Sequence, residues 1–255
     1  MNRQSADKGN VIQMIPEGII DIPQDPTESS ELYSLLQNSY QKQQQAQDIF
    51  RKFTASIRSQ EIVSLIRMQE NTASMLEKHW KPWPSPPLLD RQDQLKFDFH
   101  ETEGQAYLSM RGKNADGSEF LAFFVSDGDG LKLDWEATME LGEDQLSSLA
   151  RFPKENPVTV RVLLSASPYY LPSLPEHEYE SFLLTCLCDD TVVWGYVRRG
   201  SDEHWKIRDL LRQDGSLFEE PGEVRVTVRL KKTDDISSQN RFFITEMLHK
   251  DWVMP

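Results

Sequence analysis

Asp98 and His100 stand two residues apart in a stretch that alternates apolar and polar side chains, so a strand would carry both on one face. A carboxylate beside an imidazole can accept and pass on a proton, which is what general base catalysis needs. Leu95, Phe97 and Phe99 would occupy the opposite face, as core residues do. We therefore expect the pair to face solvent, and we keep it as a candidate ligand-binding pair without a catalytic role.

A second group of candidate binding residues is aromatic and comprises Tyr169, Tyr170, Trp194 and Tyr196. Basic residues lie on the predicted strands around them and are expected to point outward: Arg161, Arg225, Arg229 and Lys231. Rings combined with basic side chains suit single-stranded nucleic acid. The chain, however, carries 28 Lys and Arg against 41 Asp and Glu, a net charge of −13, which repels phosphates as a whole. Nucleic acid is therefore not the expected partner.

Common cofactor motifs are absent from the sequence, including G-x-x-x-x-G-K-[ST], G-x-G-x-x-G, H-E-x-x-H and C-x-x-C. We therefore expect no cofactor, and we assign no catalytic residue. Cys186 and Cys188 are too close in sequence for an unstrained disulfide, and no histidine stands near them to complete a metal site. The sequence predicts buried thiols and no bound metal.

Helices are predicted before the first strand. Residues 29–57 contain no Pro or Gly and place six apolar side chains on one helical stripe: Leu32, Leu36, Ala46, Phe50, Phe53 and Ile57. The stripe is interrupted at Ser39 and Gln43, which leaves a coiled coil as the less favoured alternative. Two shorter helices are predicted at 60–67 and 69–80, and the proline-rich run 82–87 ends the helical region.

Residues 95–141 change to a period of two. Leu131, Leu133, Trp135 and Ala137 alternate with polar residues, which predicts Trp135 in a core and Asp134 on the surface. Residues 120–125 are apolar on both faces, as in a central strand. The expected result is an antiparallel sheet of about four strands with helices over one face.

This order of helices followed by an antiparallel meander resembles the cone of the NTF2-like superfamily over residues 45–141. The run FRKFTA at 50–55, followed by a short second helix, carries the resemblance, while the strand expected between the helices is not evident. The resemblance implies an α+β cone. Members of this superfamily include enzymes and plain binding or dimerisation modules, so the fold alone does not assign a function.

Residues 157–249 predict three strands, one helix and two more strands. Strands are indicated at 158–164, 179–188, 191–198, 224–231 and around Phe242 and Ile244, and Trp205, Ile207, Leu210 and Leu211 indicate a helix. A helix between the third and fourth strands resembles an OB-fold barrel. The predicted fold class is therefore α+β, with helices packed on an antiparallel sheet (NTF2-like) followed by a small β-rich domain (OB-like).

Three parts are expected along the chain: a loose tail at 1–28, a domain at 29–150 and a second domain at 151–255. The boundary is expected between Glu140 and Pro157. No apolar run approaches the roughly 20 residues of a membrane span, and the N-terminal residues lack the apolar core of a secretory signal. We therefore expect a cytoplasmic protein.

Two function classes remain open from the sequence. The favoured one is a non-enzymatic binding or scaffold protein that acts through protein contacts, with a protein partner or a second copy of the chain. The alternative is a small-ligand-binding protein or an enzyme that uses a cone pocket. A filled apolar cone favours the first, and a cavity with two or more titratable groups pointing inward favours the second.

Overall fold

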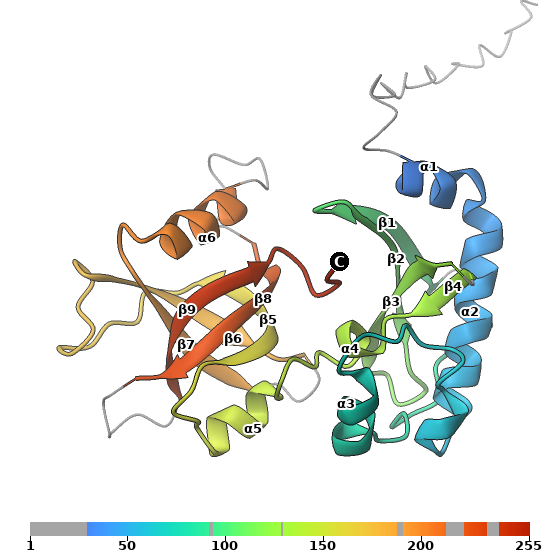
Figure 1. Cartoon of the computed structure of the whole chain (residues 1–255), viewed down its shortest axis with the longest axis horizontal. Coiled ribbons are helices and arrows are strands. Elements are labelled where there is room, and N and C mark those ends of the chain that lie inside the picture. The colour runs from blue at the N-terminus through green and yellow to red at the C-terminus, as the bar shows by residue number, and fades with distance from the viewer. Residues whose placement is uncertain (1–29, 92–93, 129, 188–190, 213–221, 234–239) are drawn as a thin grey trace, which may run out of the picture.

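The computed structural model describes residues 30–91, 94–128, 130–187, 191–212, 222–233 and 240–255. It is an α+β structure with a four-stranded antiparallel sheet and a five-stranded mixed barrel, which stand side by side in Figure 1. We call residues 30–141 the helix–sheet unit and residues 158–249 the barrel. The predicted tail at 1–28 lies outside the described residues, and the predicted domain boundary stays a prediction.

Helices of the first unit cover one face of its sheet (Figure 1). The predicted helix at 29–57 is two helices, α1 (Ser30–Gln37) and α2 (Ser39–Ala55). The predicted helix at 60–67 is wrong, because only the 3-10 turn η1 (Ser59–Glu61) forms there. Residues 65–67 instead run beside a strand, with the Arg67 amide donating to the Leu133 carbonyl at 2.8 Å. The third helix is α3 (Thr72–His79).

The sheet is an antiparallel meander in the order β1-β2-β3-β4. Its strands are β1 (Lys96–Thr102), β2 (Gln105–Lys113), β3 (Glu119–Asp127) and β4 (Gly130–Leu133). The face toward the helices is filled by apolar side chains of both layers, among them Phe50, Phe53, Leu108, Met110, Phe120, Phe124 and Leu133. The opposite face, with Tyr107 and Phe123, turns toward the barrel and belongs to a separate cluster.

The predicted alternation at 131–138 fails after Leu133, where the strand ends. Trp135 is buried as expected, but it starts the short helix α4 (Trp135–Thr138). Asp134 is also buried, which contradicts its predicted surface position. Its carboxylate caps α4 by accepting the Ala137 amide at 2.9 Å and lies 3.6 Å from the Arg67 guanidinium. A helical turn carries neighbouring residues inward together, whereas a strand would separate them.

A connection through α5 (Leu146–Arg151) leads into the barrel. The strands are β5 (Val158–Ala166), β6 (Tyr179–Thr185), β7 (Val192–Arg198), β8 (Val224–Lys232) and β9 (Arg241–His249), with α6 (Asp202–Arg212) between β7 and β8. The barrel closes in the order β5-β6-β7-β9-β8, and β7 and β9 are parallel. Its core is formed by inward Val, Leu and Phe side chains, and Leu146 and Leu149 of α5 pack against it.

Residues 250–255, which we call the strap, lie between the two units (Figure 1). Trp252 and Val253 are buried with Tyr107, Phe123 and Ala137 of the helix–sheet unit. The Trp252 indole donates to the Val162 carbonyl of β5 at 3.0 Å, so the same residue contacts both units. The strap therefore forms a third, smaller core that joins the sheet to the barrel.

Charged side chains reinforce this joint. Arg161 of β5, predicted to point outward, is buried instead. It donates to the Trp252 carbonyl at 2.8 Å and lies 3.6 Å from the Glu136 carboxylate of α4. Arg67 donates to the Met254 carbonyl at 2.6 Å. A buried guanidinium persists only when its donors are paired, which explains why carbonyl groups and an acid surround Arg161. Among the described helices, none has the length and apolar character needed to cross a bilayer.

Candidate functional site: an aromatic and arginine surface on the barrel

Tyr169 and Trp194, predicted together as binding residues, are in direct contact. Tyr169 lies in the loop between β5 and β6, and its ring stacks on Trp194 of β7 with centroids 4.5 Å apart. Arg241, the first residue of β9, places its guanidinium carbon 5.6 Å from the Tyr169 ring centroid and donates to the Tyr169 hydroxyl at 3.1 Å. All three side chains are half-buried. A cation over an aromatic face is attractive, so the loop is held against β7 and β9.

A second set of contacts holds Tyr170 beside this pair. The Tyr170 hydroxyl accepts a hydrogen bond from Arg199 at 3.4 Å. Arg199 also donates to the Glu180 carboxylate at 3.3 Å, and the same carboxylate oxygen lies 2.6 Å from His204 Nε2 and 3.5 Å from Arg208. Three nitrogen-bearing side chains thus share one acid of β6. The arginine forks are fixed in place by this shared partner.

Tyr196, the fourth predicted aromatic residue, is not at the surface. It is fully buried on β7, on the same face of the strand as Trp194. Burial raises the pKa of its phenol to about 12. Tyr196 therefore stays neutral and supports the surface from below, without contacting a bound molecule itself.

We call Tyr169, Tyr170, Trp194, Arg199 and Arg241 the aromatic–arginine surface. Its members come from a loop, from β7, from the end of β7 and from β9, so only the closed barrel brings them together. The sequence predicted the three rings but missed Arg199 and Arg241. Arg241 could not be found from the local pattern, because its contact with Tyr169 spans 72 residues. Rigid rings and arginine forks of this kind bind partners by stacking and by bidentate hydrogen bonds.

Asp98 and His100, the other predicted pair, lie on β1 of the helix–sheet unit. Asp98 is exposed, as expected, but His100 is half-buried. The His100 ring stacks on Tyr107 with centroids 4.8 Å apart, and its Nε2 lies 3.0 Å from the Ser109 hydroxyl. The pair therefore faces the barrel side of the sheet and not the helix-covered face, which holds apolar side chains.

The position of His100 predicts a pH dependence of stability. Burial, and after it the positive charge of Arg225, holds the pKa of His100 below its ordinary value of 6.5. Asp251 and Asp98 act in the opposite direction and are weaker. Between the lowered pKa and 6.5, the unfolded chain binds more protons than the folded chain, so stability rises with pH across this window and is lost as pH falls.

The test compares urea melts of the wild type and His100→Gln between pH 5 and pH 7.5. We expect the variant to lose less stability on acidification than the wild type. His177→Gln, at an exposed position of the β5–β6 loop, serves as the matched control and should follow the wild type. A His100→Gln curve parallel to the wild-type curve would show that His100 does not titrate in this window.

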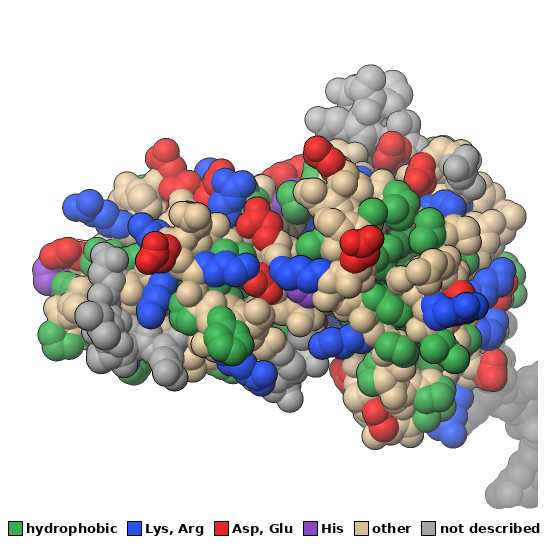
Figure 2. Space-filling view, turned by 60° about the horizontal axis from the view of Figure 1, so that its bottom comes forward, with side chains coloured by type: hydrophobic (Ala, Val, Ile, Leu, Met, Phe, Trp, Pro, Cys, Tyr) green, Lys and Arg blue, Asp and Glu red, His purple; other side chains and the backbone are tan. Residues whose placement is uncertain are grey.

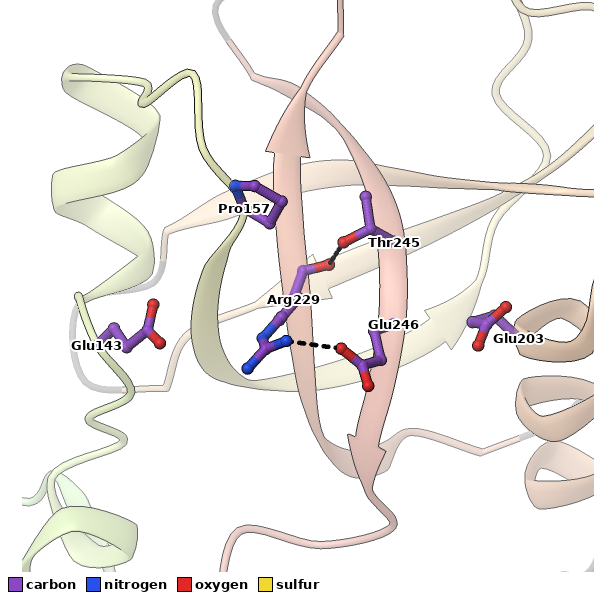
Figure 3. A pocket seen from close by; sticks show the side chains of 6 residues that line it. All are labelled: Glu143, Pro157, Glu203, Arg229, Thr245 and Glu246. Atoms are coloured by element: carbon purple, nitrogen blue, oxygen red, sulfur yellow. Dashed lines mark hydrogen bonds and ion pairs between the residues drawn. The ribbon is translucent and has the colours of Figure 1, made fainter. Parts of the chain in front are cut away.

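The predicted outward arginines are largely engaged within the chain. Arg225 pairs with Asp251 at 3.0 Å in the joint, and Arg229 pairs with Glu246 at 2.9 Å on the barrel surface. Figure 3 shows the latter pair in a shallow pocket of about 520 Å³ that is also lined by Glu143, Glu203, Pro157 and Thr245. The face in Figure 2 carries basic and acidic side chains interspersed over both units. No continuous basic surface is visible there.

We therefore expect no tight binding of single-stranded nucleic acid. Tight binding of nucleic acid needs net attraction to the phosphates. This chain is acidic, and its Arg225 and Arg229 are already paired with carboxylates. Fluorescence anisotropy with labelled oligonucleotides at low and moderate salt measures it. Submicromolar binding that weakens steeply with salt, and that Arg225→Ala with Arg229→Ala abolishes, would contradict this prediction.

Neither a metal site nor a comparison with known proteins assigns a function to this chain. Within the part of the chain that the structure describes, no group of three or more His, Cys, Asp or Glu side chains could hold a metal ion. Cys186 is buried, and Cys188 lies outside the described residues. The sequence matches no protein-family model and no curated protein. The contacts of the aromatic–arginine surface are therefore the basis on which a function is proposed.

Proposed function

We propose that this chain is a non-enzymatic binding protein that acts through protein contacts at the aromatic–arginine surface. The observation that carries the proposal is the convergence of Tyr169, Trp194 and Arg241, half-exposed and held by mutual stacking and hydrogen bonding. Trp, Tyr and Arg are the residue types that supply most of the binding energy at protein interfaces. Because these side chains are already ordered, a partner loses little of its binding energy to fixing them.

The barrel topology supports an OB-like assignment. Five strands close in the order β5-β6-β7-β9-β8, β7 and β9 run parallel, and α6 separates the third strand from the fourth. In OB barrels the second and third strands and the loop that precedes them form the binding face. Here these elements are β6, β7 and the β5–β6 loop, and they carry Tyr169, Tyr170 and Trp194.

The first unit supports an NTF2-like assignment less fully, because no strand forms between its helices. The alternative function, a small ligand or a reaction in a cone pocket, would require titratable side chains on the helix-covered face of the sheet. The described residues there are apolar and closely packed, for example Phe50, Phe120 and Phe124. This packing favours a protein that acts through protein contacts over one that binds or converts a small ligand in a pocket of the sheet.

Affinity capture with a double variant tests the proposal. Trp194→Ala with Arg241→Ala removes one ring and the cation beside it, and hot-spot truncations of this kind weaken binding about 30-fold or more. The matched control is Tyr40→Ala, because Tyr40 is an aromatic residue that is 73% exposed on α2 of the helix–sheet unit. Partners recovered by the wild type and the control, but lost by the double variant, are then purified and titrated by calorimetry.

Sedimentation analysis includes a second copy of this chain among the possible partners. A dimer that the double variant dissociates would support the proposal with the chain itself as partner. Urea melts establish that the double variant is folded. If the folded double variant retains every partner and the wild-type oligomeric state, the aromatic–arginine surface is not the binding site and the proposal fails.

A further inference from the structure

A groove of about 990 Å³ lies between the two units, apart from the aromatic–arginine surface. Phe120 and Leu121 of β3 line it on the sheet side, and Leu163, Leu187 and Leu210 line it on the barrel side. Small-molecule sites have volumes of about 300–1,000 Å³ and apolar walls with a few placed polar groups. The groove lies at the upper end of this size range, and apolar and polar residues line it in about equal number.

Basic side chains reach the groove from both units and from the strap. Arg111 of β2 is exposed and stands directly opposite Leu121 in the strand register. Arg225 of β8 crosses from the barrel and places its guanidinium carbon 5.5 Å from the centroid of the Phe123 ring. Phe123 is two residues from Leu121 on β3 and on the same face. Arg225 and Arg111 therefore approach neighbouring positions of the sheet.

Lys250 adds a third cation where the strap begins. It lines the groove beside Asp251 and is exposed. Asp251 does not neutralise this region, because its carboxylate already accepts from Arg225 at 3.0 Å, from the Trp252 amide at 2.7 Å and from the Tyr107 hydroxyl. Among the described residues, Arg111 and Lys250 have no ion-pair partner. The groove thus offers two cations that an anionic group can engage.

Acidic side chains line the groove as well, and Glu119 lies on the same face of the sheet as Arg111, in the diagonal position. Glu119 stands opposite Lys113, at the end of β2 and β3 nearest their turn. Glu140 is buried and accepts the Leu187 amide at 2.8 Å, and Glu223 is exposed where β8 begins. These acids disfavour a second negative charge on a ligand, so a single carboxylate is favoured, and only where it reaches both Arg111 and Lys250.

We propose that the groove binds a small organic acid with an apolar body and a single carboxylate. The apolar body packs between the leucines of β3 and of the barrel, and the carboxylate binds Arg111 and Lys250. Both elements are needed, because an apolar body alone gains nothing from the unpaired cations and a small anion alone leaves the leucine walls unfilled. This site is independent of the protein contacts proposed above.

Displacement of the fluorescent probe 1-anilinonaphthalene-8-sulfonate from the full chain tests the proposal. The competitors share a ten-carbon chain and differ in the head group: decanoate, 1-decanol and decylammonium. We expect decanoate to displace the probe at a concentration about tenfold below that of decanol, the order expected of one charge-assisted hydrogen bond. Decylammonium should be the weakest, because its charge matches that of Arg111 and Lys250.

Two pairs of variants separate the head-group site from the apolar wall. Arg111→Gln with Lys250→Gln should abolish the preference for decanoate and leave decanol unchanged, while Arg229→Gln, outside the groove, should leave both unchanged. Leu187→Arg should weaken all ligands that bind through the chain. Val192→Arg is its matched control, because the two residues are similarly exposed, at 49% and 42%, and only Leu187 lines the groove.

Three results would overturn the proposal: equal displacement by all three competitors, preference for decylammonium, or an undiminished preference for decanoate in Arg111→Gln with Lys250→Gln. Thermal melts of every variant establish that it is folded, because the probe also binds apolar side chains that unfolding exposes. Protein binding at the aromatic–arginine surface does not depend on ligand binding in the groove. Each proposal can therefore fail without contradicting the other.

Discussion

Trp252→Ala is expected to lower the free energy of unfolding by about 3–5 kcal/mol, as truncation of a buried tryptophan does. Trp252 is 1% exposed and sits in the small core between the units, with its ring 5.9 Å from that of Phe123. Its indole is a hydrogen-bond donor to the Val162 carbonyl. The substitution removes the contacts of the largest side chain of the strap with both units at once.

Trp252→Ala should also weaken the contact that the strap makes between the helix–sheet unit and the barrel. We expect limited proteolysis to cut the connection between residues 140 and 157 faster than in the wild type and to leave a fragment of roughly residues 150–255. Urea melts give the free energy, and Trp205→Ala is the control, because Trp205 is 51% exposed and its loss should cost no more than about 0.5 kcal/mol. Equal losses in the two variants would contradict the role of the strap.

Trp135→Ala is expected to be comparably destabilising, by about 3–5 kcal/mol, because Trp135 is 1% exposed in the core of the helix–sheet unit. Asp134→Ala should cost less, about 1–2 kcal/mol, through loss of the cap on α4. A strand at this position would have made Asp134→Ala nearly neutral. Burial raises the pKa of Asp134, so part of the cap's benefit is offset by the cost of holding a charge there.

Asp134→Asn separates the cap from the charge. The amide oxygen can still accept the Ala137 amide, whereas the negative charge beside Arg67 is gone. We expect urea melts to rank the losses as Trp135→Ala, then Asp134→Ala, then Asp134→Asn. If Asp134→Ala unfolds at the same urea concentration as the wild type, the cap contributes nothing measurable and our description of α4 is wrong.

Predictions from the sequence were best for the barrel. Strands β5, β8 and β9 and the helix α6 lie where the alternation of valines and the spacing of Trp205, Ile207 and Leu211 predicted them. They were poorest at 60–67 and at 134–138. In these short stretches, contacts with β4 and the cap on α4 decide the conformation, and a window of eight residues cannot distinguish a helix from a strand edge.

The candidate site residues also divide into those that the sequence predicted and those that it did not. The rings of Tyr169, Tyr170 and Trp194 could be singled out from residue type and approximate position, whereas their contacts with Arg199 and Arg241 could not. Arg161 was predicted to be exposed because alternation assigns it to the outer face of β5. The sequence carries no sign that the strap and α4 cover that face.

The amino-acid sequence by itself determined the α+β class, the order of elements in the barrel and the acidic charge, since these depend on local periodicity and composition. Only the tertiary structure decided that β7 and β9 pair in parallel, that residues 250–255 join the two units and that Arg111, Arg225 and Lys250 line one groove. Such contacts join residues far apart in the chain, and their energies depend on burial and mutual distance, which are properties of the folded chain alone.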